Sequence, residues 1–433
     1  MKRILFFSAI VIALLMSSCS SDDYKSYIPG GSKMIGKIDL QQFVAQTGVD
    51  QEKLKKDCME QLGEDMKSVE DMGIDLTVPI YFFADGKGVN YSFGFIAKTE
   101  DAAKFKKWFE SQAKDNKLVD ESGFSYFAED EAGVAVNDDV VILFSSTDRD
   151  KAVLKRNISK IMNKEGDEKP IAENALFNTV EGNASFASFY IDMSIIPSEI
   201  MQSSVVGSSM SFEDMKKMVI GIDSEAKNGI CDFLISAKSD DKAVQGKIDK
   251  IVKAFGKISD KALDTFSADD MAGFAMNTDG AQIIEMLKEA AGDNDDMKQM
   301  IDMFSDALNK IRGNVLARFD GAQYLVAAEG QNATSELNSL MGQMGDAPFN
   351  WGYNNGFMLF TPREVTIENP LQPASNKISS DLTNLMKNRR EVIFVNVDKL
   401  SGFTSQLDGD AKKASNAFAE VLDKVKFITI SYK

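Results

Sequence analysis

The 433-residue sequence contains no histidine, so Ser-His-Asp and Cys-His catalytic sets and histidine-ligated zinc or haem sites are excluded. Serine catalysis would then need a lysine as its base. Two Ser-x-x-Lys motifs occur, Ser111 with Lys114 and Ser224 with Lys227. The first falls on the polar part of a predicted helix and the second just before an Asn-Gly turn, where neither lysine is expected to be buried enough to lower its pKa. We therefore expect no catalytic residues and no enzyme.

Carboxylates gather in the segment GDNDDMKQM at 292–300. Such oxygen ligands suit calcium, but a calcium loop has glycine at its sixth position and glutamate at its twelfth, and both are missing here. Acidic residues also stabilise the first turn of a helix. We predict that this segment begins a helix, and that the chain binds neither a metal ion nor another cofactor.

A third candidate site is FNWGYNNGF at 349–357. Aromatic rings beside amide side chains could stack on a sugar and hydrogen-bond to it. The same pattern is typical of a hairpin that turns at Asn355-Gly356 and packs its aromatic rings on the sheet. We favour the hairpin and keep a ligand site as the alternative. The residues of that alternative site are Asn350, Trp351, Tyr353 and Asn354.

The amino terminus predicts a lipoprotein signal peptide at 1–18. MKR is a short basic start, ILFFSAIVIALLM is an apolar run too short to span a membrane, and small residues then precede Cys19. This order is similar to a bacterial lipobox, whose cysteine is lipidated. We expect Cys19 to carry acyl chains, palmitate among them, that anchor the chain to a membrane. Residues 19–27 are then a lipidated spacer.

The other cysteines are Cys58, in a charged helical stretch, and Cys231, at the start of a predicted strand. A bridge between them is conceivable, but we favour two free thiols, with Cys231 as a small core residue. The formal net charge of −17 and the scattering of lysines among acids argue against a nucleic-acid partner.

Four segments repeat one pattern of an apolar strand, a short polar residue and a helix. They begin at 32, 184, 271 and 391. Asp39, Asp192 and Asp398 fall at the equivalent place, and the third copy has Asn277 and Thr278 there. One such residue in each repeat is typical of a helix N-cap rather than of a single active site.

A strand, turn, strand and helix follow the first three copies. The predicted turns are Asp85-Gly86, Asn228-Gly229 and Asp320-Gly321. Helices are predicted to follow with N-caps at Thr99 and Ser239. In the strand 89–98, aromatic and apolar residues alternate with polar ones, which predicts a sheet with one face toward solvent.

These elements predict an α+β fold of duplicated strand-helix-hairpin-helix units, with antiparallel sheets backed by helices. The first half is expected at 28–258, with units 28–165 and 170–258. The second half is expected at 259–433, with units 259–367 and 378–433. The apolar stretch 123–146 predicts extra strands in the first unit, and 424–433 predicts a closing strand.

The lipobox with CSSDDYKSYIP, the following SKMIGKIDL and the repeated blocks resemble a family of Bacteroidota lipoproteins catalogued as domain of unknown function 4836. The resemblance implies lipidation at Cys19 and an outer-membrane location. Asp22 and Asp23 resemble the acidic signal that sends such lipoproteins to the cell surface. It implies no activity.

We therefore expect an outer-membrane, surface-exposed lipoprotein that acts as a non-catalytic binding or structural module. Its partners would be the membrane, through the anchor, and an outer-membrane protein or a glycan. Two alternatives remain: a glycan-binding or glycan-acting protein that uses Trp351 and Tyr353, and a carrier of apolar ligands.

Overall fold

The computed structural model describes residues 22–54, 72–87, 90–113, 116–121, 123–129, 131–148, 150–165, 169–197, 210–291, 294–344, 349–362, 374–404 and 419–432. Cys19, Cys58 and the predicted signal peptide lie outside these ranges. Across the described ranges, no helix combines the length and the apolar character needed to cross a membrane. The fold is α+β, and the chain divides into two compact units.

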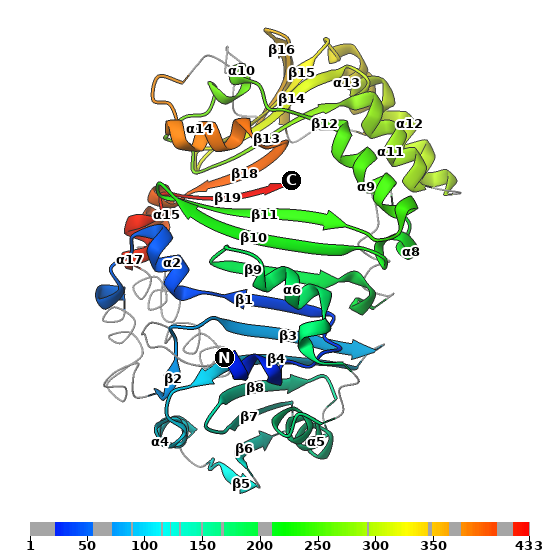
Figure 1. Cartoon of the computed structure of the whole chain (residues 1–433). Coiled ribbons are helices and arrows are strands. Elements are labelled where there is room, and N and C mark those ends of the chain that lie inside the picture. Colours follow the sequence, from blue (N-terminus) through cyan, green and yellow to red (C-terminus); the bar gives the residue numbers. More distant parts are fainter. Residues whose placement is uncertain are drawn as a thin grey trace. The chain divides into compact units, whose positions relative to one another are not determined.

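The first unit contains the described residues up to Pro197, Val219–Lys227 and the described part of Thr404–Lys424. Its main sheet is antiparallel throughout, in the order β10-β9-β1-β3-β4-β8-β7-β6-β5 (Figure 1). The strands are β1 (Met34–Ile38), β3 (Ile80–Lys87), β4 (Asn90–Thr99), β5 (Val119–Glu121), β6 (Phe124–Glu129), β7 (Ala132–Val136), β8 (Val140–Ser146), β9 (Ala187–Asp192) and β10 (Val219–Lys227). The short β2 (Ile74–Asp75) also pairs with β4. The extra strands predicted at 123–146 are confirmed.

Helices cover one face of this sheet and enclose the larger core. They are η1 (Asp22–Tyr27), α5 (Lys151–Met162) and α6 (Ala175–Glu181). The strands contribute Tyr81, Phe83, Ile96 and Ile142 to this core. On the opposite face, α4 (Ala102–Ala113) packs over the β7 and β8 end, and α2 (Leu40–Thr47) contacts β10.

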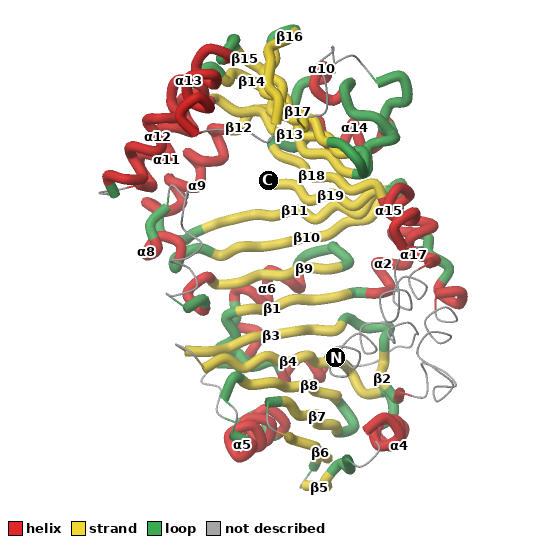
Figure 2. Tube along the Cα trace, turned by 180° about the vertical axis from the view of Figure 1, so that it is seen from behind, coloured by secondary structure: helices red, strands yellow, loops and turns green. Residues whose placement is uncertain are grey.

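The register places the apolar side chains of Phe82, Phe93 and Phe189 on the middle of that opposite face. Figure 2 shows no described helix across the strands there. Phe93 is 40% exposed. The rings of Phe82 and Phe189 stack at 5.3 Å between centroids. Gly36 on the intervening strand permits this, since a Cβ there would lie 1.7 Å from the Phe82 ring. The alternation in the strand 89–98 predicted that the face with its polar residues lies toward solvent. That is wrong, because this face, with Gly94 and Ile96, lies toward η1, α5 and α6.

The second unit has a sheet in the order β16-β17-β15-β14-β13-β18-β19-β11. Neighbouring strands in this sheet are antiparallel, except that β19 and β11 are parallel. The strands are β11 (Ile230–Lys238), β13 (Ala272–Asp279), β14 (Ile311–Phe319), β15 (Tyr324–Gly330), β16 (Phe349–Asn354), β17 (Phe357–Pro362), β18 (Glu391–Asn396) and β19 (Phe427–Tyr432). The predicted closing strand is therefore β19.

Helices α10 (Asp260–Leu263) and α14 (Ser380–Lys387) cover one face of the second sheet. Helices α11 (Gly280–Ala291), α12 (Asp295–Leu308) and α13 (Thr334–Met344) pack together beside the other face, near β14 to β16. A cross-strand row of Phe274, Ile393, Ile430 and Phe233 runs along that face. Ile393 is 41% exposed and Ile430 is 42% exposed.

The predicted turns are mostly confirmed. Asn228-Gly229 and Asn355-Gly356 both have positive φ at each residue, as a tight turn of this kind requires. Asp320 opens a four-residue loop between β14 and β15 and accepts hydrogen bonds from two following amides. The turn expected at Asp85-Gly86 is wrong, because both residues continue β3 and pair with β4.

Two predicted helix caps are also wrong by two residues. The α4 helix follows Asp101, whose side chain accepts from the Lys104 amide at 2.9 Å. Helix α9 (Lys242–Ala254) is capped by Asp241. Thr99 still belongs to β4, and Ser239 follows directly after β11. A carboxylate that lies closer to the helix satisfies its first amides in place of the hydroxyl.

Candidate functional site

The repeated aspartates are structural. Asp39 caps α2, and Asp192 caps η4 (Met193–Ile195) and pairs with Lys33 at 2.8 Å. The equivalent residue in the third copy is Asp279, which accepts from the Ala281 amide, rather than Asn277 or Thr278. Asp398 lies inside the first turn of α15 (Val397–Thr404) instead of capping it.

The residues considered for catalysis or metal binding also serve the backbone. Ser224 is buried and hydrogen-bonds to both the amide and the carbonyl of Ala187, and Ser111 donates to the Trp108 carbonyl. In the acidic cluster, Asn294 caps α12 and Asp295 and Asp296 lie in its first turn, as predicted. Among the described residues, no group of three or more acidic or cysteine side chains is placed to hold a metal ion.

The aromatic residues of the alternative sugar site lie on the β16–β17 hairpin. The Trp351 ring is half-buried against a cluster that includes Leu337 and Met358, and its indole N–H donates to Asn338 at 2.9 Å. Tyr353 is 39% exposed and donates to the Gly330 carbonyl. Asn350 and Asn354 lie on the same strand. The hairpin is confirmed, and whether it binds a sugar stays a prediction.

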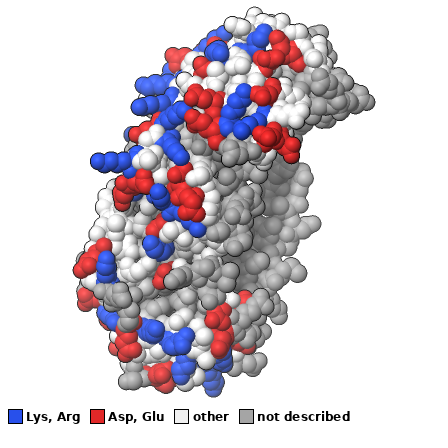
Figure 3. Space-filling view, turned by 90° about the vertical axis from the view of Figure 1, so that its right-hand side faces the viewer, with Lys and Arg blue, Asp and Glu red and all other residues white. Residues whose placement is uncertain are grey.

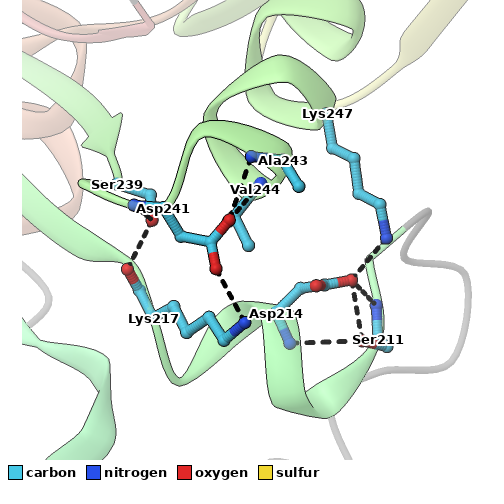
Figure 4. Close-up of polar contacts among 8 residues, drawn as sticks. All are labelled: Ser211, Asp214, Lys217, Ser239, Asp241, Ala243, Val244 and Lys247. Atoms are coloured by element: carbon cyan, nitrogen blue, oxygen red, sulfur yellow. Dashed lines mark hydrogen bonds and ion pairs between the residues drawn. The ribbon is translucent and has the colours of Figure 1, made fainter.

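Besides the acidic cluster at α12, another group of charged side chains joins α8 (Phe212–Met215) to α9 (Figure 4). Asp214 completes a capping box with Ser211 and pairs with Lys247 at 2.6 Å. Lys217 pairs with Asp241 at 2.8 Å. Every charge shown has an opposite partner, so this cluster fastens α8 to α9 and leaves no charge to act on a ligand.

The best candidate for a ligand site is a pocket of about 570 Å³ in the first unit. Its volume is within the range of about 300–1,000 Å³ that is typical of small-molecule sites. It lies beside the helix-covered face of the sheet, between η1, the ends of β3 and β4, and the last turn of α5. Its lining residues are Ser26, Tyr27, Ile28, Pro29, Phe83, Asp85, Gly86, Ser92, Phe144, Asn157, Lys160, Ile161, Lys164, Glu165, Lys169, Pro170 and Ile171.

One wall of this pocket is the segment that the sequence predicted to be a spacer. Residues 22–27 instead form η1, in which Tyr24 and Tyr27 are buried. The Tyr24 hydroxyl donates to the Pro79 carbonyl at 2.6 Å, and Lys25 pairs with Glu181 of α6 at 2.7 Å. These contacts fix Ser26 to Pro29 in place as a wall.

Tyr27 is held by two polar side chains at the edge of β8. Its hydroxyl donates to the Asp139 carboxylate at 3.0 Å and accepts from the Asn137 amide at 3.0 Å. Burial raises the pKa of Tyr27, and the neighbouring Asp139 carboxylate raises it further. The Tyr27 phenol therefore stays neutral, and its ring serves as a fixed apolar wall.

The floor of the pocket is aromatic. Phe83 and Phe144 lie with their ring centroids 6.4 Å apart and are almost fully buried. Gly94 gives the Phe83 ring room to lie across β4, because a Cβ at that position would come within 2.2 Å of the ring. Because both rings are almost fully buried, they form a rigid base under the pocket and leave little ring surface open to a ligand.

Lys164 stands at the mouth in an unusual backbone conformation. It follows α5 with φ of 54°, where glycine is the usual residue. The hydrogen bonds from the Lys164 amide to Ile161 and from the Glu165 amide to Lys160 form a Schellman motif. The Lys164 ammonium lies 4.1 Å from the centroid of the Tyr27 ring, a cation–π contact.

Sequence reasoning missed this pocket because its lining comes from distant segments. One signal was present: the stretch KIMNKEGDEK at 160–169, which begins in the last turn of α5, has three lysines, two of them four residues apart. Lysines near a helix C-terminus are ordinary dipole partners, so this signal alone indicates no site.

Comparisons with known proteins give little beyond the family. No curated protein matches the chain. Three chains of solved structures match. One of them is "Structure of crystal form I of TP0453"; the match covers 55% of this chain and 87% of that chain, at 12% identity and a TM-score of 0.32. The family model named domain of unknown function DUF4836 matches residues 24–351, and the chain therefore belongs to that family.

Proposed function

We propose that this protein is a lipid-anchored, non-catalytic binding module of the outer membrane that faces the cell exterior. The basic start, the short apolar run and Cys19 support the anchor. Asp22 and Asp23 support surface display, through their resemblance to an export signal. Anchoring places the folded units next to a membrane, where a binding module can meet its ligand.

The observation that carries binding is the first unit's pocket. It combines a ligand-sized volume, an aromatic floor and a rim of exposed lysines. The sequence motifs considered for chemistry hold backbone groups instead. A carrier of apolar ligands is the closest alternative, and the partly exposed apolar rows on both sheets favour it. The glycan-binding alternative is less favoured, because the Trp351 indole N–H already donates to Asn338 and so leaves less of the ring's edge open to a sugar.

We also infer that the two units are copies of one ancestral block. The order β10-β9-β1-β3-β4-β8-β7 in the first unit corresponds to β19-β18-β13-β14-β15-β17-β16 in the second, antiparallel at every step. A helix follows the equivalent strands β1 and β13, and another follows β4 and β15. The ligand-sized pocket is lined by residues of the first copy, so we place the binding role there.

The anchor and the location can be tested together in cells that express the full chain. We expect Cys19→Ser to abolish incorporation of labelled palmitate, and Cys58→Ser, the matched control, to leave it unchanged. Protease added to intact cells should then degrade the wild-type protein. Palmitate labelling that survives Cys19→Ser would overturn the anchor, and complete protection from the protease would overturn surface display.

A further inference from the structure

We propose that the pocket of the first unit binds a single-chain anionic amphiphile, with its acyl chain against the apolar lining of the pocket and its head group among Lys160, Lys164 and Lys169. This inference rests on the proposed function, because it names the ligand of the proposed binding module. Fatty acids and lysophosphatidates share this chemistry.

The apolar part of the argument comes from the pocket's inner surface. Phe83 and Phe144 form the floor but are almost fully buried, so the aliphatic surface that stays open comes from the half-buried Ile161 and Pro29. Burying an acyl chain against such groups contributes about 0.8 kcal/mol for each methylene. A purely polar ligand would leave this aliphatic surface exposed to water, so the ligand needs a hydrophobic part.

The anionic part comes from the charge at the rim. Three lysines line the pocket, and all three are exposed. Two carboxylates, Asp85 and Glu165, also line it, so the described lining residues carry one net positive charge. Asp85 already accepts from the Gly86 amide at 2.8 Å. The lysines favour a carboxylate or phosphate head group. The glycerol hydroxyl of a lysophosphatidate could in addition donate a hydrogen bond to one of the two acids.

The position of the pocket in the chain points to a membrane source. Ser26 to Pro29 form one wall, and Cys19 lies seven residues before Ser26. Seven residues span at most about 25 Å when fully extended. If Cys19 carries the anchor, the pocket must lie within that distance of the bilayer surface, where single-chain anionic lipids are found.

The backbone of Lys164 agrees with a binding role. A lysine with positive φ is uncommon, and such strain is concentrated at functional sites. Glycine would complete the Schellman motif more readily but would remove the ammonium beside Tyr27. The structure therefore keeps a charged side chain at the mouth in a place where folding alone favours glycine.

The test uses membranes from cells that express the full chain. They are incubated with a fatty acid that carries a diazirine and a terminal alkyne, irradiated, and the protein's labelled peptides are mapped. We expect labels on the pocket segments 26–29, 83–86, 157–165 or 169–171. An excess of oleate or oleoyl lysophosphatidate should remove the label, whereas the uncharged oleyl alcohol should not.

Variants separate the site from the ligand class. Lys160→Glu and Lys169→Glu should each lower pocket labelling by about tenfold or more, as expected for a lost charge-assisted hydrogen bond. The control is Lys151→Glu, at an exposed lysine of α5 that does not line the pocket. Equal competition by oleyl alcohol, with no effect of the lysine variants, would overturn the anionic head group and keep the binding site. Labels confined to other segments would show that the pocket does not bind an anionic amphiphile, and would overturn the ligand class proposed for it.

Discussion

At the scale of single residues, Lys164 shows how function and stability separate. We predict that the free energy of unfolding of Lys164→Ala is about 1 kcal/mol lower than that of Lys164→Gly, because only glycine adopts positive φ at low cost. Lys164→Ala should therefore unfold at a lower urea concentration. Both variants remove the ammonium, so the comparison isolates the backbone. Equal midpoints in urea would show that the Lys164 backbone carries no strain.

Cys231 gives a second test at this scale. It is a buried free thiol, and burial raises its pKa to about 11. Because only the thiolate reacts, alkylation by iodoacetamide at pH 8 should be at least on the order of 100-fold slower in the native protein than in urea. The measurement needs Cys58→Ser to remove a second thiol that iodoacetamide would also alkylate. Fast native labelling would contradict the burial of this strand.

Residue identities predicted that short polar side chains cap these helices, but at α4 and α9 they predicted Thr99 and Ser239 where an aspartate is the cap. In TED (99–101) the cap is the third residue, Asp101, because β4 continues through Thr99. In SDD (239–241) the cap is again the third residue, Asp241, because β11 ends only at Lys238. Strand length depends on pairing with a distant strand, which local sequence does not contain. The same limit explains the error at Asp85-Gly86.

At the scale of elements, the α8–α9 fastening predicts a pH effect. The hydrogen bond from Lys247 holds the pKa of Asp214 below its ordinary value. A carboxyl group with a lowered pKa in the folded state stabilises the protein above its unfolded value, near pH 4, and that contribution is lost as the pH falls further. Lys247→Met should therefore raise the Asp214 pKa and reduce the loss of stability between pH 5 and 3.

The control for this prediction is Lys242→Met, which removes an exposed lysine of the same helix that is not part of the cluster. The effect will be small, about 0.5 kcal/mol, because Lys247 is half-exposed. An Asp214 pKa that is the same in both variants, measured by NMR titration, would contradict the fastening.

The sequence predicted where most helices and hairpins lie better than it predicted which face of a strand packs against the core. The alternation in the strand 89–98 predicted a sheet with one solvent face, yet Gly94 faces the core and Phe93 lies half in solvent. The bulky Phe83 on the next strand fills the space above Gly94. A glycine paired with a large neighbour can therefore reverse the expected face, and only the register shows it.

At the scale of the whole molecule, the two units share a strand order, and the ligand-sized pocket belongs to the first. The surface in Figure 3 mixes acids and lysines over the view that it gives, and pairs such as Lys250 with Glu289 neutralise one another. The net charge of −17 therefore does not indicate a binding surface. The pocket rim is a local exception, because lysines outnumber acids among its described lining residues.

The binding module is tested most directly by native mass spectrometry of the full chain released from membranes. We predict a non-covalent adduct on the wild-type protein that is lost in Ser92→Trp, which fills the pocket from β4. Ser335→Trp, at an exposed serine of the second unit, should keep the adduct. An adduct of equal occupancy in both variants, or no adduct on the wild-type protein, would contradict a binding module that works through this pocket.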